Sequence, residues 1–340
     1  MAAYANANIK LVHGLKLTVG ARESYDETNS SVFTAGPFIG GTTLFNGKTH
    51  STPFTPKVAL SWQANPDNMY YVSASKGFRV GGVNAVTNNP NALCQSSLAK
   101  DGLTGKLKST YQPDSLWSYE VGAKNRLFGD RLLLESSAYY INWSNIQQIA
   151  PIFGCGFPVT FNLGNAKIKG ADLNLQTRPT KHLKLGLEVG YTDAYFSDTV
   201  GGFVSAGDQI GSGATTEPSA PWTGTFTAEY DWRVGQDDAY AWFEDIAQSK
   251  NPGPLNTQNP KNVVIYDPAL PANPATNQMN VRLGLVRGDA DISLFVNNLL
   301  NSHPLLDLQH TSFGDPRFEA LTFRPRTIGI TVVYTPGGGN

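Results

Sequence analysis

Apolar and polar residues alternate along much of this chain with a period of two. In the segment 117–124, WSYEVGAK, the residues Trp, Tyr, Val and Ala occupy every second position, and Ser, Glu, Gly and Lys stand between them. Such a period predicts a β-strand with one apolar and one polar face. The alternation resumes over 131–143 after Phe128, Gly129 and Asp130, so the two segments predict a hairpin. In a soluble sandwich the apolar face would point inward, whereas in a membrane barrel it would face lipid.

The same pattern predicts about thirteen strands. The segment 238–248 fits least well, because Tyr240, Trp242 and Phe243 do not share one parity. The predicted strands cover residues 2–11, 15–25, 54–64, 69–79, 115–126, 131–143, 160–177, 182–194, 222–232, 238–248, 276–287, 290–300 and 322–334.

Short and long connections alternate between these strands. The short turns lie near 12–14, 65–67, 128–130, 178–181, 233–237 and 287–289. The long connections, rich in Gly, Pro and Asn, lie near 26–53, 80–114, 144–159, 195–221, 249–275 and 302–321. Short turns at one end and long loops at the other are typical of outer-membrane barrels. A two-layer soluble β protein would explain the alternation equally well, but not this asymmetry or strands of ten or more residues.

Charged and aromatic side chains support the membrane alternative. Aromatic residues gather near strand ends on the apolar parity, as in the girdles at the two membrane interfaces; they are Trp62, Tyr70, Trp117, Tyr140, Tyr191, Trp222, Trp232 and Tyr334. Many charged residues fall on the other parity, where a water-filled interior would hydrate them: Lys57, Glu120, Lys124, Glu135, Asp172, Lys184, Glu188, Glu229, Asp231, Arg282 and Asp291.

Composition narrows the possible classes of protein. The net charge is −1, so nothing favours a nucleic-acid partner, and charged residues make up 16% of the chain, below the roughly 25% of soluble domains. No apolar run approaches the ~18–20 residues of a membrane helix. The N-terminal stretch MAAYANANIK has no signal-peptide core and already predicts a strand. We therefore expect either a cytoplasmic protein or a fragment that lacks its front end.

Five stretches, in order along the chain, resemble the C-terminal barrel half of TonB-dependent outer-membrane receptors. They are YYVSASKGFRVGGVN (Tyr70–Asn84), SYEVGAKNRLFGDRLLLESSAYYINWSNIQ (Ser118–Gln147), NLGNAKIKGADLNLQTRP (Asn162–Pro179), LFVNNLLN (Leu294–Asn301) and FRPRTIGITVVY (Phe323–Tyr334). Within the third, Gly170 is expected on the lumen side, where its missing side chain lets a plug or a neighbour approach closely.

The resemblance implies an all-β fold, a partial transmembrane antiparallel β-barrel. About thirteen C-terminal strands of a plugged 22-stranded barrel would occupy residues 1–334, and 335–340 would be a flexible tail. The complete protein would lie in the outer membrane of a Gram-negative bacterium. It would bind a scarce nutrient, most commonly a ferric siderophore, and import it with energy from the TonB complex, which would act through the missing N-terminal plug. The resemblance implies neither an enzyme nor a cofactor. The alternatives are a passive porin and a soluble carbohydrate-binding or structural β protein.

The long loops on the outer side carry the candidate ligand contacts, because their tips can project aromatic and amide groups over the lumen. These candidates are Phe38, Phe45, Arg79, Asn84, Trp143, Gln147, Phe153, Phe157, His310, Phe313 and Arg317. Each could instead pack a loop, and Arg79 and Arg326 could be structural anchors.

The loops hold few other groups that could carry chemistry. Cys94 and Cys155 lie in consecutive long loops and could form a disulfide in an oxidising exterior. The spacing of His303, Asp307 and His310 could hold a metal, but solvated loop residues are the default and no metal site is predicted. The histidines, all at turns or in loops, form no catalytic constellation.

Overall fold

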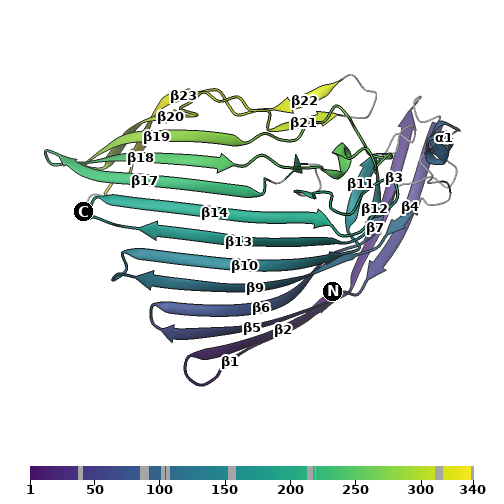
Figure 1. Cartoon of the computed structure of the whole chain (residues 1–340), viewed down its shortest axis with the longest axis horizontal. Coiled ribbons are helices and arrows are strands. Elements are labelled where there is room, and N and C mark those ends of the chain that lie inside the picture. The colour runs from purple at the N-terminus through teal and green to yellow at the C-terminus, as the bar shows by residue number, and fades with distance from the viewer. Residues whose placement is uncertain are drawn as a thin grey trace.

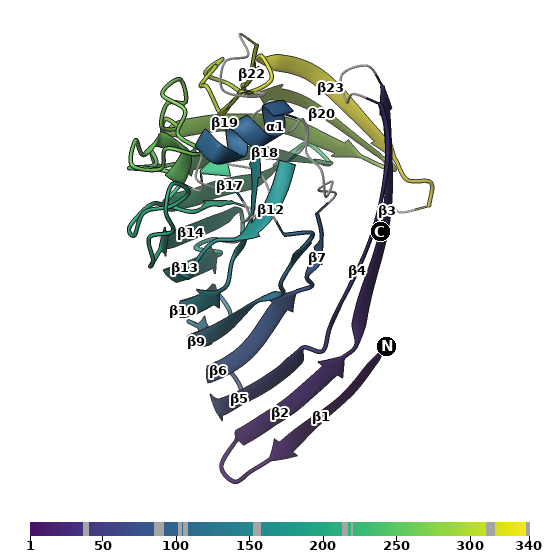
Figure 2. The same ribbon diagram turned by 90° about the vertical axis from the view of Figure 1, so that its right-hand side faces the viewer.

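The computed structural model describes residues 1–36, 41–84, 92–100, 104, 108–151, 158–212, 217–218, 220–310 and 317–337. Among them, thirteen long strands form one antiparallel sheet in which sequence neighbours lie side by side, as Figure 1 shows. The sheet curves into a trough (Figure 2). Within the described ranges no strand pairs with the outer edges of its first and last strands, so the barrel is not closed. The predicted fold class, a partial antiparallel barrel, is confirmed.

All thirteen predicted strands are present. They are β1 (Ala2–Lys10), β2 (Leu15–Ser24), β5 (Phe54–Asn65), β6 (Asn68–Arg79), β9 (Asp114–Leu127), β10 (Leu132–Ser144), β13 (Ala166–Thr177), β14 (Leu183–Phe196), β17 (Trp222–Val234), β18 (Asp237–Gln248), β19 (Thr276–Arg287), β20 (Ala290–Asn297) and β23 (Thr327–Tyr334).

Two of these strands begin later than their alternation suggests. The segment 160–177 is interrupted at Gly164, whose φ of 71° lies in the left-handed region, and the sheet strand starts at Ala166. The segment 322–334 is interrupted at Pro325, which has no N–H for a ladder bond, and the strand starts at Thr327.

The short and long connections separate to opposite ends of the sheet. In Figure 1 the tight turns lie at the left and the long connections at the right; we call these the turn end and the loop end. At the first turn His13 and Gly14 have φ values of 55° and 78°. A Cβ on Gly14 would lie 2.4 Å from the carbonyl oxygen of Gln63, so this turn requires glycine.

The loop end contains more regular structure than the sequence predicted. Residues 26–36 and 41–51 form the paired strands β3 and β4, which the sequence pattern missed because Thr, Ser and Asn replace the apolar alternation there. The elements of the loop end are β3 (Asp26–Gly36), β4 (Gly41–Ser51), β7 (Gly82–Val83), α1 (Ala92–Lys100), β8 (Thr110–Tyr111), β11 (Gln147–Pro151), β12 (Pro158–Asn162), β15 (Gly211–Ser212), β16 (Glu217–Pro218), the 3₁₀ helix η2 (Asn256–Gln258), β21 (Asp307–His310) and β22 (Phe318–Leu321). No helix within the described residues is long and apolar enough to cross a membrane.

The strand register assigns the two faces of the sheet. Leu187 lies opposite Phe226, and the next residue along, Glu188, lies opposite Thr225. The outer, convex face is apolar and exposed: Val121 and Leu283 are each 53% exposed and Ile330 is 71% exposed. An apolar face this extensive and this exposed needs lipid rather than water.

The register also resolves the ambiguous strand β18. Tyr240 and Trp242 lie opposite Asp231 and Glu229 on the concave face, whereas Phe243 lies opposite Ala228 on the outer face.

At the loop end the polarity of the two faces is reversed. On β13 and β14 the concave positions Ala166, Ala194 and Phe196 are buried, and they belong to an apolar core with residues of the long loops. The outward positions between them include Lys167 and Asp193. Apolar side chains inside and charges outside are the pattern of a protein in water, so this reversal marks where the apolar membrane layer ends.

The two faces predict opposite effects for the same substitution at adjacent positions. We expect Leu187→Arg to block membrane assembly, because an arginine in the hydrocarbon costs about 2–4 kcal/mol at mid-depth. Glu188→Arg, one residue along β14 and facing the hydrated trough, should assemble normally. Heat-modifiable migration of outer-membrane fractions measures both variants. Equal assembly of the two would contradict the assignment of the faces.

Candidate functional site

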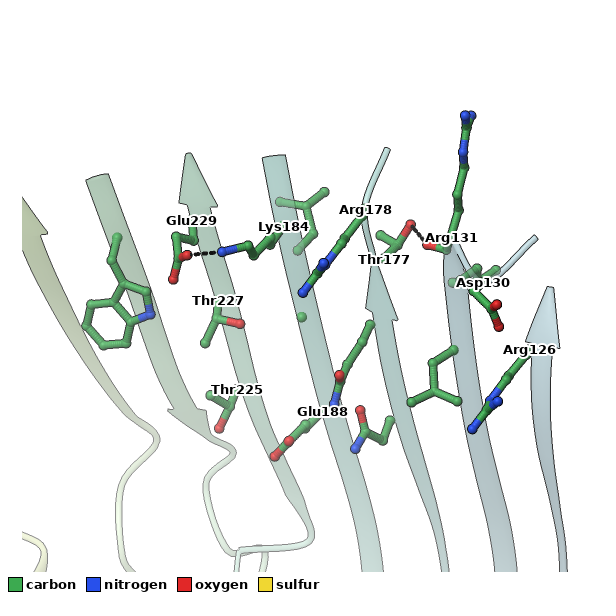
Figure 3. Close-up of a pocket in the computed structure, with 17 residues that line it drawn as sticks. Arg126, Asp130, Arg131, Thr177, Arg178, Lys184, Glu188, Thr225, Thr227 and Glu229 are labelled. Atoms are coloured by element: carbon green, nitrogen blue, oxygen red, sulfur yellow. Dashed lines mark hydrogen bonds and ion pairs between the residues drawn. The ribbon is translucent and has the colours of Figure 1, made fainter. Parts of the chain in front are cut away.

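The concave face of the trough carries most of the polar chemistry of the sheet. Near the turn end a cavity of about 470 Å³ is lined by basic, acidic and hydroxyl side chains from β9 to β18, many of them labelled in Figure 3. Lys184 lies 2.5 Å from Glu229 and 3.1 Å from Asp231. Lys124 and Glu135, on neighbouring strands, form a further pair at 2.9 Å. Because Lys124 and Lys184 each have a carboxylate on the adjacent strand, this part of the wall contains cross-strand ion pairs with both signs of charge.

Aromatic rings on the concave face lie over glycines of the next strand in the sheet. Gly122 lies opposite Tyr71, and a Cβ at this glycine would lie 2.5–2.6 Å from the tyrosine ring. The same close approach joins Tyr139 to Gly170, Tyr240 to Gly284 and Phe295 to Gly329.

The hydroxyls of these tyrosines then reach polar partners. Tyr71 donates to Glu120 at 2.5 Å, and Tyr139 reaches over Gly170 to Thr192 on β14, with 2.7 Å between the oxygens. The expected close approach at Gly170 is therefore made by a neighbouring ring. Each of these two tyrosine rings packs on the adjacent strand, and its hydroxyl adds a hydrogen bond, which for Tyr71 is to that strand and for Tyr139 is to the strand beyond it.

Toward the loop end the concave wall carries fewer charged side chains. A second cavity, of about 550 Å³, is lined by hydroxyl and amide side chains of the strands, among them Thr192, Thr223, Gln248, Thr276 and Gln278. Loop residues Leu305, Leu306, Leu321 and Phe323 also line it, together with the carboxylate of Asp307. Uncharged hydrogen-bonding groups beside apolar side chains are the usual lining of a small-molecule site.

Four of the predicted ligand contacts belong to the scaffold that holds the loops. Asp114 is 1% exposed and accepts hydrogen bonds from the Arg79 guanidinium, with Nε at 2.9 Å, and from the backbone N–H of Gln147 at 3.1 Å. The Arg79 guanidinium also donates to the Gln147 carbonyl at 3.1 Å and lies 4.8 Å from the Trp143 ring centre. The expected anchoring role of Arg79 agrees with this geometry.

Asn84 joins two other loops in a similar way. Its side chain is buried and accepts from the Thr160 N–H at 2.9 Å, while its amide donates to the Thr160 carbonyl at 2.9 Å and to the Lys108 carbonyl at 3.1 Å. The Asn84 side chain thus pairs with the backbone of β12 through the two hydrogen bonds that a residue of a neighbouring strand would make.

A second buried carboxylate, which the sequence did not single out, joins the loops after β14 and β18. Asp208 is 1% exposed and accepts from the side-chain amides of Asn259 and Asn262, each at 2.6 Å, and from the Ser205 N–H at 2.7 Å. Three hydrogen-bond donors compensate the buried charge. The Asn-rich composition of 251–262 is the only signal in the sequence that points to it.

Three other predicted site residues lie in the described part of the chain. Phe45 lies half-buried on β4, remote in sequence from the anchored loops. His310 ends β21 and Arg317 precedes β22. Phe38, Phe153, Phe157 and Phe313 lie outside the described residues, so ligand contact at all these positions stays a prediction.

The cysteine and metal predictions have different outcomes. Cys94 lies in α1, is 2% exposed and is not a free thiol. Cys155 lies outside the described residues, so its pairing with Cys94 stays a prediction. Within the described part of the chain no three His, Cys, Asp or Glu side chains are grouped so that they could hold a metal ion.

The comparisons with known proteins agree with this geometry. Residues 1–299 match the family described as TonB dependent receptor-like, beta-barrel. The chain belongs to this family. The resemblance carried by the five motifs is thereby confirmed, and the family consists of receptors and transporters rather than enzymes.

Solved structures of receptors share the fold at low sequence identity. The ferric yersiniabactin uptake receptor FyuA of Yersinia pestis aligns with a TM-score of 0.73 and 13% identity over 97% of this chain and 44% of its own. The copper transporter OprC aligns at 0.68 with 16% identity, over 97% and 48%. The siderophore receptor PiuA of Acinetobacter baumannii aligns at 0.64 with 16% identity, over 97% and 42%. The chain therefore spans less than half the length of these receptors.

The Arg79–Asp114 contact predicts a local loss of order. Arg79→Ala would leave the Asp114 carboxylate buried without its cation, which costs on the order of 3 kcal/mol. We expect amide hydrogen exchange to accelerate around 112–115 and 146–148. Arg287→Ala is the matched control, because its pair with Asp237 is at 4.0 Å and the Arg287 side chain is 80% exposed. Unchanged exchange in Arg79→Ala would show that the contact does not hold the loops.

The ring-over-glycine contacts predict a steric clash that a second substitution relieves. Gly122→Ala should destabilise the assembled sheet by about 1–3 kcal/mol, as overpacking usually does, because the new methyl group meets the Tyr71 ring. Adding Tyr71→Ser should recover part of that loss. Gly224→Ala is the control, since its nearest new contact would be at 3.6 Å. Midpoints of unfolding in urea compare the three, and no recovery in the double variant would contradict the clash.

Proposed function

We propose that residues 1–334 form the C-terminal part of the barrel of an outer-membrane receptor that imports a scarce nutrient. One observation carries the proposal: a thirteen-stranded antiparallel sheet with an apolar outer face, a charged concave face and its long loops at one end. Membership in the TonB-dependent receptor family supports the same conclusion. The tail proposed for 335–340 includes residues 338–340, which lie outside the described part of the chain.

A ferric siderophore is the first candidate for the nutrient. Two of the structures described above are a ferric yersiniabactin uptake receptor and a siderophore receptor, and a third is a copper transporter. Their identities of 13–16% support the shared fold, and the ligand class is part of the proposal. The long loops, with the cavity lined by Leu305, Leu306, Leu321 and Phe323, would form the outer approach to the lumen.

Coupling to the TonB complex would act through a plug domain in the complete protein. The concave wall of paired charges at the turn end offers both signs of charge to such a domain. The folded loop core favours this receptor over a passive porin, because Phe196, Val204 and neighbouring side chains cover the concave face at the mouth.

Uptake by the complete protein tests the proposal. We expect cells that express this barrel with its plug to accumulate radiolabelled iron from hydroxamate, catecholate or carboxylate siderophores. A protonophore or loss of TonB should abolish the accumulation. Unspecific diffusion of small solutes that is insensitive to the protonophore would instead identify a porin.

The open edges make a separate prediction for the 340 residues expressed alone. The outer edges of β1 and β23 would leave backbone groups unpaired in lipid, at several kcal/mol each. With an odd number of antiparallel strands, these two strands run parallel to each other and cannot pair as neighbours do in an up-and-down barrel. We expect aggregation and no siderophore uptake without the preceding part of the barrel. Uptake by the 340 residues alone would overturn the partial-barrel proposal.

A further inference from the structure

Three lysines stand on the outer, lipid-side face of the sheet at the loop end. Lys76 on β6 and Lys167 on β13 lie in one row across four neighbouring strands. Between them in this row are Trp117 on β9 and Asn142 on β10. All four share the parity of Val121, which is 53% exposed on the apolar face. Lys169, two residues along β13, points the same way.

This lysine patch, Lys76, Lys167 and Lys169, lies where the apolar surface stops. Toward the turn end the outward positions beside it are Val72, Val121, Ala138 and Ala171. Aromatic side chains occupy outward positions around it, namely Trp117, Tyr119, Tyr140, Tyr191 and Tyr195. Such a belt marks the membrane interface, and a lysine there can lay its stem on apolar surface and hold its ammonium group among the headgroups.

The patch has an excess of positive charge. Its acidic neighbour is Asp193, whose carboxylate lies 3.3 Å from the Lys169 ammonium, and the same ammonium lies 5.9 Å from the Tyr195 ring. Lys167 and Lys169 are exposed. Along β6, β9, β10, β13 and β14, the described outward positions hold these three lysines and this one aspartate as their charged residues.

Two other sectors of the outer face carry acidic residues at the loop end. On β2 the outward position at the loop end is Glu23, opposite Phe54. On β18 it is Asp245, opposite Phe226, and Asp245 accepts a hydrogen bond from Asn277 at 2.7 Å. The lysine patch is therefore a local feature and not a ring of basic residues around the barrel.

We propose that the lysine patch binds the phosphate groups of an anionic lipid headgroup in the leaflet on the loop side. The proposal rests on the outer-membrane placement proposed above. Charge complementarity selects the occupant, because basic clusters beside an apolar membrane surface attract anionic headgroups. The aromatic belt would hold the sugar or glycerol part of the lipid against the sheet while the ammonium groups contact phosphate.

Lipid retention by the complete protein tests this site. The protein is assembled in nanodiscs of phosphatidylcholine that contain phosphorylated lipid A, or lipid A stripped of its phosphates, and native mass spectrometry counts the lipid A retained after mild detergent release. We expect phosphorylated lipid A to be retained and the stripped form to be lost. The Lys167→Gln/Lys169→Gln variant should retain the phosphorylated form about thirtyfold more weakly.

Two control variants make the result specific. Lys10→Gln/Lys57→Gln removes the same charge from the concave face and should retain lipid A as the unaltered protein does, and Lys167→Arg/Lys169→Arg should also retain it. Equal retention of both lipid A forms, or equal loss in both glutamine variants, would overturn the proposal. Because the assay involves no nutrient, failed siderophore uptake with intact lipid retention would count against the proposed transport alone.

Discussion

The need to pair every backbone N–H and C=O group in lipid is the constraint on which this structure depends. Water cannot satisfy these groups in the hydrocarbon, so strands must satisfy one another. The result is a single ladder from β1 to β23 with uninterrupted antiparallel pairing across the membrane layer. The alternation of apolar and polar residues follows from that ladder, because each strand separates lipid on one side from hydrated space on the other.

The hydrated side of the wall must still be rigid, and it lacks a conventional core. Cross-strand ion pairs such as Lys184–Glu229 and rings laid over glycines such as Tyr71 on Gly122 supply contacts there that an apolar core would supply elsewhere. At the loop end, side chains of the strands and of the long loops are instead buried in an apolar core. Two buried carboxylates are compensated there in different ways: Asp114 by a guanidinium and a backbone N–H, and Asp208 by side-chain amides and a backbone N–H.

The boundary between these two regimes is where both function and lipid contact are expected. Above it the concave face is covered by loops and the outward face becomes polar; below it the outward face is apolar. A ligand would meet the loops first, and the lysines of the outer face lie at the same level as the aromatic belt. The surroundings of each strand change from hydrocarbon to water at this boundary, and that change explains both the loop core and the lysine patch.

The sequence by itself determined the strands, their order and the face of most residues, because a period of two depends only on neighbours along the chain. It missed the β3–β4 hairpin, where Thr and Ser replace apolar residues, and it ran two strands past Gly164 and Pro325. Only the tertiary structure decided that Asp114 and Asp208 are buried and that Arg79 holds a loop, since those contacts join segments 33 to 54 residues apart. It also decided that Ile168 faces inward and Lys167 outward. The alternation of apolar and polar residues looks the same on both sides of the lipid boundary. At the loop end, however, distant loops bury the concave face, so the apolar residues of the strands point inward there and the charged residues point outward.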